Sequence, residues 1–320
     1  MKTLRILTAS LAGLAFAGLA HAAGGAKHAH GPEGGWPFEG FTGQYDQASV
    51  QRGYQVYKQV CSSCHGMKLL SYRNLGEKGG PFYDPAYPNA NDNPYVRALA
   101  AENEILDPVP NDMGEFDFRP ATPADAFRSP FANDAAARAA NGGAVPPDLS
   151  VITKARHGGA SYIYNLMLGY PDFDLYEDRI TERDGETIYE TLIDLSKFEK
   201  LGDYRPETGP AYILQPTGQY YNPYMPGDIT ANFEGDPRHT PPGGFLAMAP
   251  QLTPGRVEYT DGTEATIEQM AYDVAQFLAW ATDPKLEARK EVGLATMIYL
   301  LILSVLLWFS YKRIWRKVEH

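Results

Sequence analysis

The chain has 320 residues, 21% of them charged, and a formal net charge of −11 at pH 7. This acidic balance argues against nucleic acid as a partner and favours a partner with a basic surface, because complementary fields speed encounter. An apolar segment lies near each end, and the roughly 270 residues between the two segments suit one large domain with many Gly- and Pro-rich loops.

The first 22 residues have the pattern of a secretory signal peptide. Lys2 and Arg5 precede an apolar run, and small residues at Ala20 and Ala22 form a cleavage pattern. The apolar core is short for a membrane helix that is retained, which is the alternative. We therefore predict a signal peptide over residues 1–22.

The first helix of the exported domain is predicted to begin near Asp46, which can serve as its N-cap. Apolar or aromatic side chains then recur at intervals of four, three and four residues, which is a helical spacing. These side chains are Val50, Tyr54, Tyr57 and Cys61. The helix therefore leads directly into the only two cysteines of the chain.

The sequence CSSCH at residues 61–65 is the attachment signature of a c-type haem. Cys61 and Cys64 stand three residues apart, on one side of a helical turn, so both sulfurs can bond to the vinyl groups along one porphyrin edge. His65 can then reach the iron. A tethered thiol oxidoreductase also uses CxxC. That motif normally follows a strand, however, whereas the residues before Cys61 have helical spacing.

The sixth iron ligand is sought among the eight methionines. Met225 and Met248 lie in loops rich in Pro and Gly, whose irregular backbone can bring a side chain to a metal. We favour Met248 because it lies eighteen residues before the last soluble helix, where single-domain c-type cytochromes carry their ligand loop. A His/Met pair leaves no open coordination position on the iron and raises its reduction potential. Such an iron favours electron transfer over small-molecule chemistry.

Two more helices are predicted in the exported domain. One covers residues 161–170, after two glycines, and the last soluble helix begins with a capping-box pattern from Thr266 to Gln269. Pro284 is predicted to end it.

Residues 292–311 form an uncharged run of twenty, long enough to cross the ~30 Å of hydrocarbon in a bilayer. Four basic residues follow this run at once, so the tail is predicted to stay cytoplasmic. We predict an exported domain over residues 23–285, a linker and transmembrane anchor over 286–311, and a basic tail over 312–320. Residues 23–291 carry −16 once the +2 of the leader and the +3 of the tail are set aside.

Longer blocks make the sequence resemble the cytochrome c1 family, the haem c subunits of ubiquinol:cytochrome c reductase (the cytochrome bc1 complex). These blocks are RGYQVYKQVCSSCHGMKLLSYRNL, ARAANGGAVPPDLSVITKARHGGASYIYNLMLGY, YYNPYMPG and LAMAPQL. The resemblance implies a mainly α fold with extensive loops: a class I c-type cytochrome domain plus one C-terminal transmembrane helix.

The resemblance assigns roles to matched positions. Cys61 and Cys64 would be the thioether cysteines of one covalent haem c, and His65 and Met248 would be its axial ligands. A main-chain carbonyl in the segment around Pro147 would accept the imidazole N–H of the histidine, which fixes the tautomer.

Arg156 and Tyr162 resemble the pair that meets a haem propionate in this family. A guanidinium can hold a partly buried carboxylate, so the assignment is chemically reasonable.

Cytochrome b and a Rieske iron-sulfur protein would be partners in a membrane complex, with a basic soluble cytochrome c as electron acceptor. The chain resembles bacterial members, so its haem domain would lie in the periplasm, anchored in the inner membrane. The acidic residues 102–117 are a candidate docking face. A membrane-anchored monohaem cytochrome of another respiratory chain is the remaining alternative.

The chain is longer than the mitochondrial form of the family over residues 171–219 and 227–242. No cysteine is left to brace these insertions with a disulfide. The segment DLYEDRITERDGETIYETLIDLSKFEK within the first insertion is expected to be a helical flap or a subunit contact.

Overall fold

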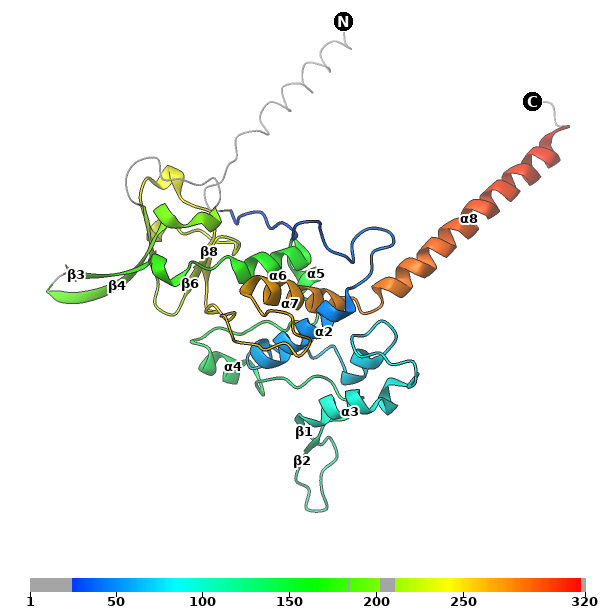
Figure 1. Ribbon diagram of the computed structural model, residues 1–320, viewed down its shortest axis with the longest axis horizontal. Helices are drawn as coiled ribbons and strands as arrows, with labels where there is room; N and C mark the ends of the chain where they lie inside the picture. Colours follow the sequence, from blue (N-terminus) through cyan, green and yellow to red (C-terminus); the bar gives the residue numbers. More distant parts are fainter. Residues whose placement is uncertain (1–24, 184, 202–210, 318–320) are drawn as a thin grey trace, which may run out of the picture. The chain divides into compact units, whose positions relative to one another are not determined.

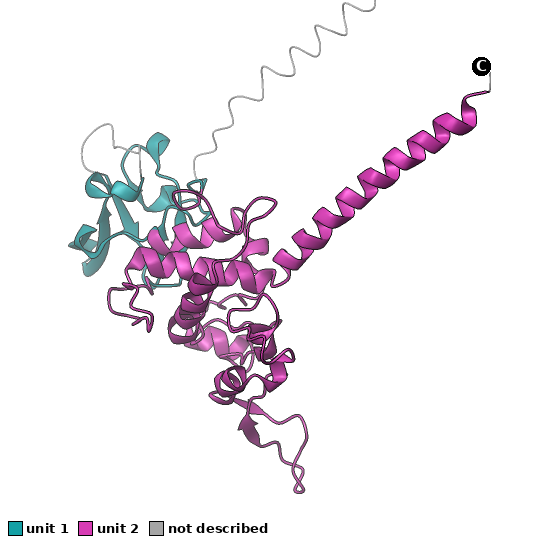
Figure 2. Cartoon of the chain, turned by 45° about the vertical axis from the view of Figure 1, so that its right-hand side comes forward, with its two compact units in different colours: residues 1–28, 169–249 teal, residues 29–168, 250–320 magenta. Residues whose placement is uncertain are grey.

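A computed structural model describes residues 25–183, 185–201 and 211–317, so the predicted signal peptide lies outside the described residues. The chain forms two compact units, coloured separately in Figure 2. The unit made of residues 29–168 and 250–320 is called the helical unit. The unit made of residues 169–249, with the N-terminal residues up to 28, is called the sheet unit. The predicted exported domain, residues 23–285, contains parts of both.

The helical unit holds the described α-helices and one small hairpin (Figure 1). Its helices are α2 (Gln47–Val56), α3 (Pro94–Ala101), α4 (Asp134–Ala140), α5 (Ile152–Ala155), α6 (Gly159–Leu168), α7 (Ile267–Thr282) and α8 (Leu286–Trp315). The hairpin pairs β1 (Glu104–Leu106) with β2 (Phe118–Pro120). Short 3-10 turns connect these elements at Tyr72–Gly76 and Ala90–Asp92.

The two helices predicted from their caps are confirmed. The Asp46 carboxylate accepts the backbone N–H groups of Ala48 and Ser49 at the start of α2. The Thr266 hydroxyl accepts the N–H of Gln269 at the start of α7. Both caps satisfy donors that a helix end would otherwise leave unpaired.

Helices α2 and α7 cross in close contact, and this crossing is the centre of the helical unit. A Cβ atom at Gly53 would lie 2.0 Å from the carbonyl oxygen of Asp273, so only glycine permits this approach. The buried Asp273 carboxylate accepts a hydrogen bond from the Ser49 hydroxyl at 2.6 Å and one from the Arg52 Nε at 2.9 Å. These bonds satisfy a charge that would otherwise be costly to bury.

The expected helical, loop-rich fold is supplemented by the sheet unit, whose core is a four-stranded antiparallel sheet in the order β3-β4-β5-β7. The strands are β3 (Tyr176–Arg183), β4 (Glu186–Asp194), β5 (Tyr212–Gln215) and β7 (Phe233–Glu234). A second, two-stranded sheet pairs β6 (Tyr220–Asn222) with β8 (Gly244–Leu246). Short 3-10 turns lie at Phe173–Leu175, Leu195–Lys197, Glu199–Leu201, Thr230–Asn232 and Pro237–His239.

The expectation of a helical flap is wrong, since that segment forms the β3-β4 hairpin, with Tyr176 opposite Ile193 and Arg183 opposite Glu186. Its many Ile and Thr residues favour strands, and an Asp-Gly pair between the strands favours a hairpin turn. Exposed charged residues on both strands obscure this pattern in the sequence, which is why the segment was expected to be helical.

Two devices stabilise this insertion without a disulfide. The first is a cluster of buried side chains that includes Ile193, Phe198 and Tyr221. The second is Arg179, which donates from its Nη2 to Glu190 at 2.7 Å and to Glu234 at 2.6 Å. The guanidinium thereby connects β3, β4 and β7.

Helix α8 is the one described helix that is long and apolar enough to cross a membrane. It has no buried residue, and it extends away from the rest of the helical unit (Figures 1 and 2). Its position agrees with the anchor predicted from the sequence.

Candidate functional site

The CSSCH motif lies at the C-terminal end of α2, where the helix passes into the π-helical turn Tyr57–Cys61. The backbone N–H of Ser62 donates to the carbonyl of Tyr57, and the N–H groups of Cys64 and His65 both donate to the carbonyl of Cys61. One continuous turn therefore carries both thiols and the imidazole. This agrees with the helical placement of the motif predicted from its spacing.

The imidazole of His65 is oriented by a distant backbone group. Its Nδ1 lies 2.8 Å from the carbonyl oxygen of Pro147. Since a carbonyl only accepts, Nδ1 must carry the proton of a neutral ring, which leaves Nε2 with a lone pair for a metal. Burial lowers the pKa of His65, although the Pro147 carbonyl and the charge of Asp148 oppose that shift. A neutral imidazole is the form that binds a metal.

Backbone contacts hold the Pro147 segment against the motif. The N–H of Leu149 donates to the carbonyl of Gly66 at 2.8 Å, and the N–H of Lys68 donates to Asp148 Oδ2 at 3.0 Å. The other carboxylate oxygen of Asp148 accepts the N–H of Ser150 at 3.0 Å. Asp148 therefore joins the segment after the histidine to the segment that holds its ring.

Cys61 does not have the lowered pKa of an exchange-active cysteine. Burial raises the pKa of Cys61 to about 12, and the neighbouring Cys64 makes a smaller contribution in the same direction. An exchange-active cysteine needs a lowered pKa, because the thiolate is the nucleophile. The motif also follows a helix and not a strand, so both observations count against a thiol oxidoreductase.

Arg156 and Tyr162, the predicted propionate pair, lie close together. Arg156 ends α5, and Gly158, with φ of 88°, turns the chain into α6. The Tyr162 side chain is buried, which raises its pKa, while the guanidinium of Arg156 acts in the opposite direction through its charge and a hydrogen bond. Their proximity is compatible with a shared role, and the role itself stays a prediction.

Both candidate methionine ligands belong to the sheet unit. Met248 is half-buried and lies two residues after the end of β8, and its carbonyl accepts a hydrogen bond from the hydroxyl of Tyr170 at 2.8 Å. Met225 is also half-buried, in a turn where its N–H donates to the carbonyl of Asn222. His65 belongs to the helical unit, so its pairing with Met248 stays a prediction.

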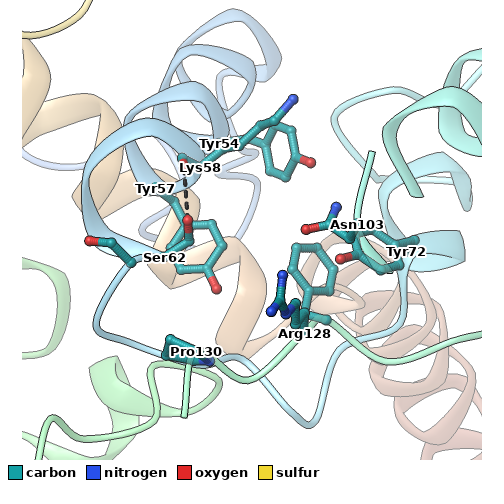
Figure 3. Close-up of a pocket in the computed structure, with 10 residues that line it drawn as sticks. Tyr54, Tyr57, Lys58, Ser62, Tyr72, Asn103, Arg128 and Pro130 are labelled. Carbon is teal, nitrogen blue, oxygen red and sulfur yellow. Dashed lines mark hydrogen bonds between the residues drawn. The ribbon is translucent and has the colours of Figure 1, made fainter. Parts of the chain in front are cut away.

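A cavity of about 280 Å³ lies beside the motif (Figure 3). Ser62 and Ser63 contribute to its wall, and the Ser62 hydroxyl donates to the carbonyl of Lys58 at 2.7 Å. Cys61, Cys64 and His65 are not among the described residues that line it. The cavity therefore touches the motif only through its two serines among the described lining residues.

The acidic residues 102–117 form most of the β1-β2 hairpin, which projects from the helical unit (Figure 1). Lys58 forms an ion pair with Glu102, which places the base of the hairpin beside the cysteine-bearing turn. Sequence reasoning missed that the hairpin also exposes large apolar side chains. These are Leu106, Val109, Met113, Phe116 and Phe118, each more than half exposed.

Two thiols and a neutral imidazole on one turn, with Nε2 available, fit a covalently attached haem. This donor set defines the chain as a c-type cytochrome.

Comparison with known proteins gives the family. Residues 36–318 match the model of the Cytochrome C1 family, so the chain belongs to that family and carries one covalent haem c as an electron carrier.

Three relatives are similar to this chain, and the chain covers a different share of the length of each. The chain is 39% identical to cytochrome c1 of Rhodospirillum rubrum, over 96% of this chain and 97% of the relative. It is 38% identical to a mitochondrial cytochrome c1 heme protein of Arabidopsis thaliana, over 98% of this chain and 81% of that protein. It is also 38% identical to cytochrome b/c1 of Bradyrhizobium diazoefficiens, over 89% of this chain, which spans only 35% of that relative.

Proposed function

We propose that this chain is the haem c subunit of a bacterial ubiquinol:cytochrome c reductase. It accepts single electrons from a Rieske iron-sulfur protein and passes them to a soluble cytochrome c. The contact between His65 and Pro147 carries the proposal, because it gives the tautomer that an axial histidine needs. The family match and the relative named cytochrome b/c1 support the association with a cytochrome b.

The residues that would hold the haem have distinct tasks. Cys61 and Cys64 would attach it, His65 and Met248 would ligate its iron, and Arg156 would hold a propionate together with Tyr162. When bound, haem c supplies one-electron redox chemistry through its iron. The Pro147 carbonyl makes the imidazole more basic, and a methionine thioether raises the potential.

The β1-β2 hairpin is the proposed docking face for the electron acceptor. It carries six carboxylates between residues 102 and 117. The one basic residue in the hairpin, Arg119 at its base, pairs with Asp107 and Asp125, so the hairpin keeps a net negative charge. Its exposed apolar side chains can be covered by a partner. A basic cytochrome c with an apolar patch would complement both properties.

The proposed location is the bacterial inner membrane, with the haem domain in the periplasm. The signal peptide predicted for residues 1–22 would export the N-terminus, and α8 would cross the membrane once. The basic residues that follow the apolar run would hold the C-terminus in the cytoplasm.

Purification of the full chain from detergent-solubilised membranes tests this function. We expect the absorption spectrum of a covalent haem c, and co-purification of a b-type cytochrome and a Rieske protein. A covalent haem without these two companions would instead indicate a carrier of another respiratory chain. A preparation without covalent haem would overturn the assignment altogether.

A further inference from the structure

A short loop before α2 is fastened to the first turns of α8. This segment, residues 37–44, is called the 37–44 loop and lies beside the start of α8 (Figure 1). The Lys290 ammonium donates to the carbonyl of Phe38 at 2.6 Å and to the carbonyl of Gly43 at 3.0 Å. The N–H of Tyr45, just after the loop, donates to the Glu287 carboxylate at 2.8 Å. The loop therefore has a defined position along α8.

The loop is compact and closed at its base. The N–H of Gln44 donates to the carbonyl of Pro37 at 3.0 Å, and the N–H of Glu39 donates to the carbonyl of Trp36 at 3.0 Å. Gly43 approaches the backbone so closely that a Cβ atom would lie 1.8 Å from the carbonyl oxygen of Glu39. The tip of the loop is thus carried on a well-defined base.

The aromatic side chains around the loop have opposite environments. Phe38 lies with its ring centroid 5.6 Å from Trp36 and 5.1 Å from Tyr45, and Trp36 also stacks on Tyr272 at 5.3 Å. Phe41, at the tip, is 70% exposed. The loop therefore packs the ring of Phe38 against its flanking residues Trp36 and Tyr45 and presents the ring of Phe41 outward. Such an exposed ring suits an apolar environment better than water.

The position of the 37–44 loop along α8 indicates whether Phe41 lies in water or near the membrane. Lys290 is two residues before Val292, where the uncharged run of the anchor begins. At about 1.5 Å per residue, the loop contact is only ~3 Å along the helix axis from the apolar run. Glu39 is the one ionisable side chain in the 37–44 loop. Membrane-bound segments that lie at this level of a bilayer bury apolar side chains such as Phe, Trp and Leu at the boundary between headgroups and acyl chains.

We propose that Phe41 inserts into the headgroup region of the bilayer leaflet on the haem side, so that the 37–44 loop is a second membrane contact beside the anchor. This inference depends on the proposed function only in taking α8 as a membrane-spanning helix. Two points of contact fix the tilt of the helical unit over the membrane, because rotation about the start of α8 would pull Phe41 out of the lipid.

Spin labels on single cysteines test the proposal in the full, haem-loaded chain. The chain is reconstituted in bilayers of phosphatidylethanolamine and phosphatidylglycerol. Phe41→Cys is compared with Phe118→Cys on the β1-β2 hairpin, where the native side chain is 67% exposed. Leu301→Cys, in the middle of α8, reports on the anchor itself. Oxygen, which concentrates in lipid, and a water-soluble nickel chelate serve as relaxing agents.

We expect the label at position 41 to collide more often with oxygen than with the chelate, and the label at 118 to show the reverse. Equal, water-like accessibility at 41 and 118 would overturn the proposal, provided the label at 301 lies in lipid. A water-exposed label at 301 would instead contradict the anchor. Should Phe41→Cys fail to acquire haem, Thr42→Cys, also exposed on the loop, gives the same depth measurement.

Discussion

The Nδ1 atom of His65 lies 2.8 Å from the carbonyl oxygen of Pro147, although 82 residues separate them in the chain. The contact leaves Nε2 as the only nitrogen of a neutral ring that can bind iron. Asp148, the next residue, adds a negative charge that favours the positively charged form of the ring. The same charge should favour the ferric over the ferrous state of a bound haem.

We therefore expect Asp148→Asn to raise the midpoint potential. The change should be on the order of tens of millivolts, because a lost interaction of about 1 kcal/mol corresponds to roughly 40 mV for one electron. An asparagine has one acceptor oxygen for the two N–H groups that Asp148 now binds, so a loss of about 1–3 kcal/mol in stability should accompany it. Spectroelectrochemical titration measures the potential.

The matched control is Pro147→Ala, which keeps the backbone carbonyl that His65 contacts. Its potential should stay close to that of the wild type. An equal shift in both variants would show that local packing, and not the charge of Asp148, sets the effect.

Met248→Leu should lower the midpoint potential and allow carbon monoxide to bind the reduced protein. The loss of a thioether ligand should shift the potential by on the order of 0.1 V or more, within the ~0.8 V range that axial ligands set. Met225→Leu, in the same unit, should leave both properties unchanged. If the two variants exchange these phenotypes, Met225 is the sixth ligand.

Local signals explain which parts of the fold could be predicted from the sequence. An Asp or Thr N-cap followed by helical spacing was sufficient for α2 and α7, because both features act within one helix. The uncharged run was sufficient for α8. The contact of His65 with Pro147 has no local signal, and the expectation of such a carbonyl came only with the family resemblance.

The β3-β4 hairpin could not be predicted in the same way, because its apolar side chains point inward only near the end of β4, at Leu192 and Ile193. Most of its length is exposed and charged, so the alternation that identifies a strand is weak. The exposed apolar side chains of the β1-β2 hairpin were missed for a related reason. Exposure is decided by tertiary packing, and apolar residues in a sequence normally indicate a core.

Charge reversal on the β1-β2 hairpin should slow electron transfer to a basic cytochrome c. We expect Asp112→Lys combined with Glu115→Lys to lower the second-order rate at low ionic strength by roughly tenfold, as lost electrostatic steering does. The difference should nearly vanish in 1 M salt, where the Debye length is about 3 Å. Stopped-flow reduction of the acceptor by the purified complex measures the rate.

The control for this pair lies on the other hairpin, where Glu182 and Glu186 are also exposed carboxylates. Glu182→Lys combined with Glu186→Lys changes the net charge equally and should leave the rate nearly constant. Equal slowing by both double variants would assign the effect to total charge and reject a specific docking face.

Gly53→Ala should disrupt the crossing of α2 and α7, because the added Cβ would meet the carbonyl oxygen of Asp273 at 2.0 Å. The backbone of both helices must move, so we expect the free energy of unfolding to fall by about 1–3 kcal/mol or more, as it does in overpacked cores. Gly293→Ala is the matched control, since a Cβ there has no neighbour within 4 Å and alanine is the better helix former. Loss of the haem spectrum on heating in detergent measures both variants. An unchanged melting temperature for Gly53→Ala would show that the crossing is looser than the structure indicates.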